Sequence, residues 1–385
     1  MGYDPWAPDV IADPYPSYQR LRDETPCYHE PEHDIWVLSR YDDVMAAARA
    51  HDRLSSADGV LFARMPLPMM LTIDPPDHTR LRRLVTRDFT PRAIEAWRPL
   101  VERTVDEIVT PLFEGTPEFM ASVAFPLPVV VIADVLGIPR DDHPQFKRWS
   151  DDIVKGFGLT TPDPALANTV IDAILAVKTY LTALIDERRR HPSDDLLSRL
   201  AQPADEGKLT DEELFWFCLL LLVAGNETTT NLLGNMLLAF VEHPEQWQVV
   251  HERRELIPAA VEEALRFDSP IQGLFRTAAT RYMVAGVEIP VGARVLLLYG
   301  AANRDASRFE RADEFLVERN PADHLAFGSG IHLCLGAHLA RLEGAAVLRA
   351  LLERARGVEL AGAPIRGTNA SLRGLVSLPL TFARN

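Results

Sequence analysis

The sequence predicts a mainly α-helical protein with smaller antiparallel β-sheets. Helical spacing of apolar residues recurs along most of the chain, for example at 91–113 and 257–267. Residues 215–224 are apolar on every side, which indicates a helix buried in the middle of the molecule. Two stretches, 274–284 and 287–298, read as strands, because turn residues separate and interrupt them.

The remaining elements follow from the same patterns. A short helix is expected at 14–25, a hairpin through Cys27 and 35–38, an irregular apolar segment at 55–73, and a C-terminal hairpin at 358–384. Further helices are expected at 42–50, 126–136, 141–155, 166–190 and 210–242. A Gly/Pro-rich bridge at 156–164 fits either a lid or an ordinary connector.

Composition restricts the class of protein. The chain has 385 residues and a net charge of −15, which argues against nucleic acid as a partner. Its three cysteines, Cys27, Cys218 and Cys334, are widely spaced and odd in number, so they suit a reducing compartment rather than a disulfide framework. Residues 1–13 do not resemble a signal peptide, and the longest apolar run, 214–224, is shorter than the roughly 20 residues of a membrane span. We therefore expect a cytoplasmic protein without a membrane anchor.

The residues from 327 to 341 form a glycine-punctuated loop that ends in a cysteine and continues into an amphipathic helix. We expect this helix to stop near Gly357, and Cys334 to lie at the positive end of its dipole, where a thiolate is favoured. Gly328, Gly330 and Gly336 leave room for a flat, bulky group to approach the backbone. The alternative is an inert buried cysteine beside a glycine-rich turn.

The pattern Phe-Gly-x-Gly-x-His-x-Cys-x-Gly, at residues 327–336, resembles the heme-binding loop of the cytochrome P450 family. This resemblance implies heme b with the Cys334 thiolate as axial ligand. The thiolate would donate electron density to the heme iron and so favour O–O cleavage. It further implies that Phe327, Gly328, His332 and Gly336 contact the cofactor.

His78 and Arg82 stand four residues apart in a helix that opens after a proline-rich turn, so they share one face. A solvated basic face is the ordinary interpretation of such a pair. The resemblance implies instead that both residues hold the heme propionates, together with Arg276 and His332, while Arg80 and Arg83 lie on the surface.

A polar interruption follows the apolar half of the long helix. Thr210 to Glu213 match a capping box, and polar residues then appear at 226–229 within a helix that should be buried. A satisfied polar cluster that only kinks the helix is one interpretation. The resemblance implies the oxygen-activation motif, with Glu227 and Thr228 relaying protons and Ala224 beside the heme. The family often has His where this chain has Asn226, which leaves the acid–threonine pair intact.

Glu263 and Arg266 form a Glu-x-x-Arg pattern, which by itself is a weak motif for a local ion pair. The resemblance implies a structural triad completed by Arg319. Cys218 is expected in the core and Cys27 in a strand.

The expected substrate pocket is mostly apolar, which indicates a hydrophobic small molecule. Arg64, Asn226, Gln272 and Arg373 are possible polar anchors, although the two arginines are expected to face solvent. Methionine and aromatic clusters are as often core as pocket, and for 55–73 both interpretations stay open. The pocket candidates are Phe62, Met69, Leu220, Val223, Gln272, Leu274, Phe275 and Leu372.

Taken together, the resemblance implies that residues 1–385 form one compact heme-enclosing unit without a fused reductase. It implies a monooxygenase that inserts one oxygen atom from O2 into a C–H bond, with electrons from a separate ferredoxin and an NAD(P)H-dependent ferredoxin reductase. Three alternatives are a peroxide-driven heme-thiolate enzyme, a heme-based gas sensor or carrier, and a helical binding protein without heme. The acid–threonine pair speaks against the first, and the lack of an output domain speaks against the second.

Overall fold

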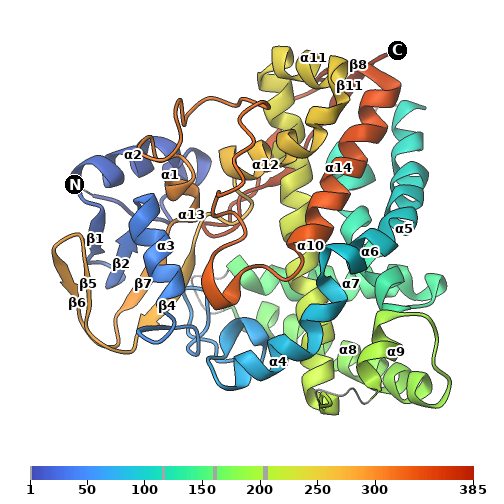
Figure 1. Ribbon diagram of the computed structural model, residues 1–385, viewed down its shortest axis with the longest axis horizontal. Helices are drawn as coiled ribbons and strands as arrows, with labels where there is room; N and C mark the ends of the chain where they lie inside the picture. Colours follow the sequence, from blue (N-terminus) through green and yellow to red (C-terminus); the bar gives the residue numbers. More distant parts are fainter. Residues whose placement is uncertain (1, 115–117, 159–162, 203–206) are drawn as a thin grey trace.

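The computed structural model describes residues 2–114, 118–158, 163–202 and 207–385. A sheet-rich part contains the N-terminus, and a larger helical part contains the C-terminus (Figure 1). Helices therefore dominate and the sheets are small, as the sequence predicts.

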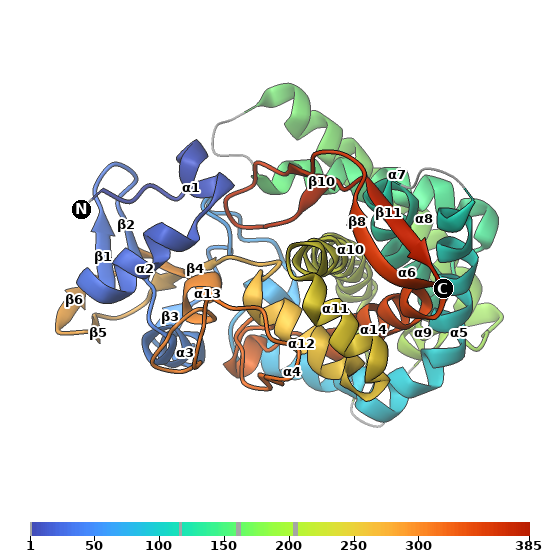
Figure 2. The same ribbon diagram turned by 90° about the horizontal axis from the view of Figure 1, so that it is seen from above.

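The helix α10, Asp211–Glu242, is the central element of the helical part. It packs against α6, α8, α12 and α14, which in the view from above lie to its right and below it (Figure 2). Thr210 caps its N-terminus in a capping box with Glu213, as expected. Most of its residues from Leu214 to Phe240 are buried, which confirms a helix through the middle of the molecule.

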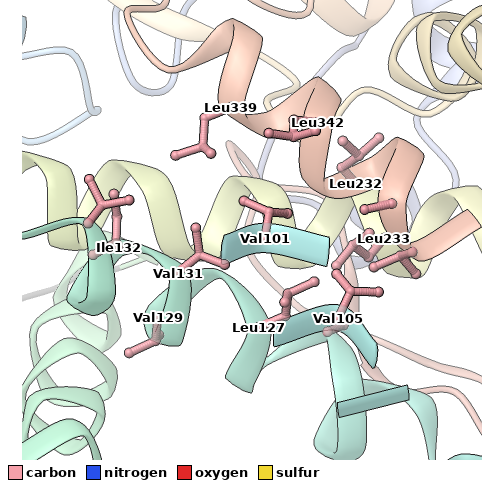
Figure 3. Close-up of a cluster of buried hydrophobic side chains, with 14 of the residues drawn as sticks. Val101, Val105, Leu127, Val129, Val131, Ile132, Leu232, Leu233, Leu339 and Leu342 are labelled. Atoms are coloured by element: carbon pink, nitrogen blue, oxygen red, sulfur yellow. The ribbon is translucent and has the colours of Figure 1, made fainter. Parts of the chain in front are cut away.

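The main hydrophobic core lies where α10 meets its neighbours (Figure 3). Valines and leucines of four helices interdigitate there, and removing this apolar surface from water is the main stabilising term. The labelled core residues are Val101 and Val105 of α5, Leu127, Val129, Val131 and Ile132 of α6, Leu232 and Leu233 of α10, and Leu339 and Leu342 of α14.

Most of the other helices agree with the expected ranges within a few residues at each end. The bounds of these other helices are α1 Pro8–Ala12, α2 Tyr15–Glu24, α3 Tyr41–Arg49, α4 Asp77–Thr86, α5 Pro91–Val109, α6 Pro126–Leu136, α7 His143–Val154, α8 Pro164–Arg190, α9 Leu196–Ala201, α11 Pro244–Glu252, α12 Ile257–Phe267, α13 Tyr299–Ala302 and α14 Ala337–Arg354. The sequence analysis missed α1, α9, α11 and α13. Gly137 ends α6 in the left-handed conformation at φ 78°, where glycine is favoured.

A five-stranded sheet in the order β1-β2-β7-β4-β3 forms the sheet-rich part. Its strands are β1 Cys27–Glu30, β2 Ile35–Leu38, β3 Leu54–Ser55, β4 Leu274–Ala278 and β7 Arg294–Leu297. The β2–β7 pair is parallel and the others are antiparallel, so the expectation of purely antiparallel pairing is wrong at this one pair. Sequence alternation does not distinguish the two directions, because it depends only on which face is buried.

Four expected elements have different limits in the structure. The two long strands each divide, because a separate hairpin of β5 Tyr282–Val284 and β6 Val287–Ile289 turns at Ala285 and Gly286. The C-terminal hairpin is two ribbons instead of one, β8 with β11 and β9 with β10. Gly357 does not end α14, because the chain already enters β8 after Arg354. The bounds are β8 Ala355–Leu360, β9 Ile365–Arg366, β10 Leu375–Ser377 and β11 Leu380–Arg384.

One helix of the described part of the chain, α8, is long and apolar enough by length and composition to cross a membrane. Its most apolar 18-residue window has a mean hydropathy of 1.4 and is 28% buried, and α8 packs against α7. The sequence analysis did not identify α8 as a helix with the length and composition of a membrane span. The bridge at 156–164, considered as a lid, lies partly outside the described residues.

Candidate functional site

Cys334 lies in the loop between a short 3-10 turn, Gly330–His332, and α14. Its backbone N–H donates to the Phe327 carbonyl at 3.0 Å, which closes the loop. Gly328 and Gly330 adopt φ values of 71° and 73°, in the left-handed region that favours glycine. At Gly336 a Cβ would meet no protein atom within 4 Å, so the loop presents open space beside the thiol.

The three cysteines differ in their surroundings. Cys27 and Cys218 are buried, as expected, and burial raises the pKa of each thiol to about 12. Cys334 is solvent-accessible. Because only the thiolate is a good metal ligand, this accessible cysteine is the one suited to a ligand.

The electrostatics of Cys334 correct one expectation. Burial raises the pKa of its thiol, although the Gly336 N–H and the guanidinium groups of Arg82 and Arg341 oppose the shift. Cys334 is thus surrounded by protein on most sides while its side chain still borders accessible space. Desolvation is the largest of these influences, so the surrounding chain by itself favours the thiol. A bound cation supplies the missing stabilisation of the thiolate.

Four residues expected to hold propionates come together beside this loop. The rings of His78 and His332 are 4.5 Å apart and edge-to-face, and Arg82 donates to the Leu333 carbonyl at 2.7 Å. Burial, Arg276 and His78 lower the pKa of His332 to about 3. Arg276 belongs to β4, so segments nearly 200 residues apart in sequence converge at this point.

This cluster fits the anionic groups of heme. Both ring nitrogens of His78 and Nε2 of His332 are buried and have no hydrogen-bond partner among the described residues. Buried polar groups without partners are costly, so they indicate a ligand that supplies acceptors. An open cavity of about 600 Å³ adjoins them, a size typical of small-molecule sites. Its lining residues are His78, Thr79, Arg82, Arg83, Thr86, Arg87 and Ile331.

His51 is an additional neighbour that the sequence analysis missed. Its imidazole contributes to lowering the pKa of both His78 and His332, so it lies close to the same cluster. The residue follows α3, and only the packing of α3 against the 3-10 turn brings it there. No local sequence motif marks it.

Ala224, Glu227 and Thr228 occupy consecutive turns of α10. The helix is continuous through these residues, so the polar residues do not end it. The Thr228 hydroxyl donates to the Ala224 carbonyl at 2.7 Å, a bond that the helical backbone provides. Ala224 is exposed although its neighbours on α10 are mostly buried, which shows that this face of α10 borders accessible space.

Glu227 has partners on another helix. Burial raises its pKa, Asp151 raises it further, and Lys147 lowers it. Lys147 and Asp151 are joined by an ion pair of 2.6 Å on α7, and their side chains are 35% and 44% exposed. This pair links the neighbourhood of Glu227 to solvent, and the sequence analysis missed it because α7 and α10 are about 75 residues apart.

Asn226 faces α7 as well. Its side-chain amide donates to the Ser150 hydroxyl at 2.9 Å, and both residues are buried. Asn226 is therefore not a free anchor for substrate.

The apolar pocket candidates divide into two groups. Leu220 and Val223 of α10, with Met69, belong to the main core cluster around α10. Leu274 packs against the sheet cluster. Leu372 forms a β-bridge with Ile271.

The other three candidates, Phe62, Phe275 and Gln272, do not belong to the surroundings of α10. Phe62 and Phe275 stack at 5.9 Å in the cluster between the sheet and the N-terminal helices, since β4 directs alternate side chains to opposite faces. Gln272 is buried, and its amide donates to the Ser269 carbonyl beside Gly300. For these three residues the structure favours a core role.

The two arginines considered as anchors also differ. Arg64 is exposed and pairs with Asp58, as expected for a surface residue. Arg373 is buried, and its Nε donates to Asp268 at 2.7 Å, so the expectation that it faces solvent is wrong. Asp268 also accepts a hydrogen bond from Tyr15 at 2.5 Å, which connects the C-terminal ribbon to the N-terminus.

Glu263, Arg266 and Arg319 form the expected triad. Arg266 pairs with Glu263 at 2.8 Å with both side chains fully buried, and Arg319 pairs with Glu263 at 3.1 Å. Arg266 also donates to the carbonyls of Asn303 and Ala312, so it joins α12 to the irregular segment before the cysteine loop. This supports a structural role for the triad.

This combination of fold, accessible cysteine, cationic cluster and acid–threonine pair defines a heme-thiolate oxidoreductase. The family model of cytochrome P450 matches residues 17–359, and the chain belongs to this family. Its members bind heme with a cysteine thiolate as axial ligand, and the chain is a monooxygenase.

Particular relatives are similar over nearly the whole chain. The β-dihydromenaquinone-9 omega-hydroxylase of Mycobacterium tuberculosis is 42% identical over 98% of this chain and 77% of its own length. The monooxygenase PikC of Streptomyces venezuelae is 40% identical over 98% of this chain and 92% of its own. The crystal structure of cytochrome P450 CYP109Q5 from Chondromyces apiculatus matches with a TM-score of 0.91 and 35% identity, over 100% of this chain and 99% of that one. A structure of CYP109E1 from Bacillus megaterium with corticosterone matches with a TM-score of 0.89 and 35% identity, over 97% and 99%.

Proposed function

We propose that this monooxygenase hydroxylates a C–H bond of a hydrophobic small molecule and uses Glu227 and Thr228 to deliver protons. When bound, heme supplies the oxidation chemistry, and the chain contributes positioning, exclusion of water and proton transfer. The observation that carries this proposal is the acid–hydroxyl pair beside Ala224, which is exposed within the mostly buried middle of α10.

The residues of the cysteine side would hold the cofactor. Cys334 would provide the axial thiolate, and the unpartnered nitrogens of His78 and His332 would donate to propionate oxygens. Arg82 and Arg276 would neutralise the same anions from α4 and β4.

Protons would reach the site along α7. Lys147 and Asp151 contact solvent, Glu227 is their electrostatic neighbour, and Thr228 follows Glu227 on α10. Because burial raises the pKa of Glu227, its carboxyl group holds a proton more readily than an exposed glutamate does.

The substrate class follows from the apolar walls and the relatives. Leu220, Val223, Leu274 and Leu372 offer no charge to a ligand. One relative is named for omega-hydroxylation of a menaquinone, and one similar structure holds corticosterone. We propose a largely hydrophobic substrate of the terpenoid, steroid or long-chain type.

Electrons would come from separate proteins, a ferredoxin and its NAD(P)H-dependent reductase, in the cytoplasm. Four basic residues near the cysteine side are candidates for docking: Arg80, Arg83, His338 and Arg341. Two of them already form ion pairs, Arg80 with Glu213 and Arg341 with Glu262. Arg83 is exposed on the rim of the open cavity and has no carboxylate partner among the described residues. We propose Arg83, with Arg87 beside it, as the centre of the docking surface for an acidic ferredoxin.

The absorption spectrum of the purified protein, reduced and exposed to carbon monoxide, tests the site. A strongly red-shifted Soret band in the native protein that is lost in Cys334→Ser supports the thiolate assignment. A band typical of histidine-ligated heme in the native protein would contradict it. Titration of the same sample with candidate hydrophobic compounds then identifies those that displace water from the iron.

Stopped-flow reduction by a ferredoxin tests the docking surface. Arg83→Glu should slow reduction and weaken its dependence on salt, since rim charges act on association. Arg148→Glu, a matched reversal of an exposed arginine on α7, should leave the rate unchanged. Equal reduction rates in native protein and Arg83→Glu would exclude this surface.

A further inference from the structure

Asn226 and Ser150 make a buried polar contact between α10 and α7. The Asn226 amide donates to the Ser150 hydroxyl at 2.9 Å, and Ser150 has no exposed surface. Its neighbours on the buried face of α7, Phe146 and Ile153, are apolar. A buried amide or hydroxyl without a partner costs free energy, and the contact with Ser150 supplies a partner for the Asn226 amide. His143, the other buried polar residue of this face, lies 3.0 Å from the Ile138 carbonyl instead.

The contact selects one register of the two helices. A hydrogen bond of this kind requires about 2.7–3.2 Å between its heavy atoms. A shift of α7 by a single residue displaces its side chains by about 1.5 Å along the axis and rotates them to another face. Any such shift breaks the bond and leaves both groups buried without a partner.

The residues that follow the bonded pair are the charged ones. Glu227 comes directly after Asn226, and Asp151 comes directly after Ser150. Lys147, one turn earlier on α7, donates to Asp151 at 2.6 Å. The polar bond and the proton path are therefore adjacent on the same two helices.

We propose that the Asn226–Ser150 hydrogen bond is a positioning contact, which holds α7 against α10 in the register that places Asp151 and Lys147 beside Glu227. Asn226 and Ser150 are then positioning residues for proton delivery. The proposal rests on the proposed role of Glu227, but the placement of α7 is measurable independently of that role.

The direction of the effect follows from the groups that face Glu227. Asp151 and Lys147, both on α7, are the charged groups that act on it, and burial is the largest cause of its raised pKa. Loss of the bond lets α7 separate and admits water. Both the burial and the effect of Asp151 then decrease, so the pKa of Glu227 falls.

Infrared titration of the holoenzyme tests this directly, with the Glu227 carboxyl band assigned from its absence in Glu227→Gln. Ser150→Ala should lower the pKa of Glu227 by about one unit, because shifts from burial are of this size or larger. Alanine is a strong helix former, so α7 itself is preserved. The matched control is Thr230→Val, which removes another buried hydrogen bond of α10, to the Ala124 carbonyl, without touching α7.

An unchanged pKa of Glu227 in Ser150→Ala, or an equal fall in Thr230→Val, would overturn the proposal. A second readout is the solvent deuterium isotope effect on oxygen consumption, which should increase in Ser150→Ala alone. If the infrared shift appears while Glu227→Gln leaves oxygen consumption and product yield unchanged, the positioning contact stands and the proposed proton role of Glu227 fails.

Discussion

Thr228 and Glu227 are adjacent in sequence, but their surroundings give them different tasks. The Thr228 hydroxyl is held by the Ala224 carbonyl and is only partly buried, whereas Glu227 faces the ion pair of α7. A hydroxyl fixed in this way can orient water and pass on a proton. In the proposed mechanism the carboxyl group of Glu227 would exchange protons with solvent.

Thr228→Ala should separate electron consumption from product formation. Positioned proton transfer contributes on the order of 10²-fold or more, so product yield should fall strongly while oxygen consumption continues as hydrogen peroxide release. The ratio of peroxide to product measures this. Thr228→Ser keeps the hydroxyl and should retain most of the coupling. A tightly coupled Thr228→Ala variant would contradict the assignment.

Glu343 is a second acid whose environment governs its behaviour. It is buried in α14, its Oε2 has no partner among the described residues, and burial raises its pKa to about 8. The folded state therefore binds this proton more tightly than the unfolded state does, where the ordinary value is 4.5. The resulting stability is present below about pH 4.5 and is lost as the pH rises towards about 8.

The Glu343→Gln variant should not show this loss of stability as the pH rises. Its free energy of unfolding at pH 8 should exceed that of the native protein by about 1–3 kcal/mol, and the difference should shrink at pH 5. Urea unfolding at the two pH values gives the comparison. A difference that is the same at both pH values would show that Glu343 does not titrate in the folded protein.

At the scale of the element, the cysteine loop uses its glycines for two different reasons. Gly330 has φ 73°, and a Cβ there would lie 2.9 Å from the Ala48 carbonyl oxygen. Gly336 has φ −82°, and a Cβ there would meet no protein atom within 4 Å. Gly330 is required because its backbone conformation and the nearby Ala48 carbonyl leave no room for a side chain. Gly336 leaves space for a ligand.

Gly330→Ala and Gly336→Ala should therefore affect different properties, the first stability and the second heme retention. Gly330→Ala should lower the free energy of unfolding by about 1–3 kcal/mol through strain at positive φ and contact with α3. Gly336→Ala should change it by less than about 0.5 kcal/mol in the heme-free protein, but should lower the retention of heme. Unfolding curves of heme-free protein and heme titrations distinguish the two, and equal destabilisation would contradict the assignment.

At the scale of the whole molecule, the buried Glu263–Arg266 pair connects the helical part to the segment that leads into the cysteine loop. Glu263→Gln leaves the Arg266 charge buried without its partner, which should cost about 3–5 kcal/mol of stability. Arg98→Ala breaks an exposed pair with Glu95 and should cost less than about 1 kcal/mol. Urea unfolding measures both. A similar small loss for Glu263→Gln would show that water compensates the charge.

The sequence alone determined the features that depend on local chemistry. The capping box at Thr210, the buried half of α10, the turn at Ala285-Gly286 and the motif around Cys334 all agree with the structure, because short-range spacing fixes them. The common face of His78 and Arg82 follows from helical periodicity in the same way.

Only the tertiary structure decided which distant groups meet. It placed Asp151 beside Glu227, Ser150 against Asn226 and Arg373 on Asp268, and it turned Phe275 into the sheet core. It also made desolvation the largest influence on the pKa of the Cys334 thiol. The physical reason is that burial and contact between charges depend on the packing of whole helices and sheets, which no local pattern of residues encodes.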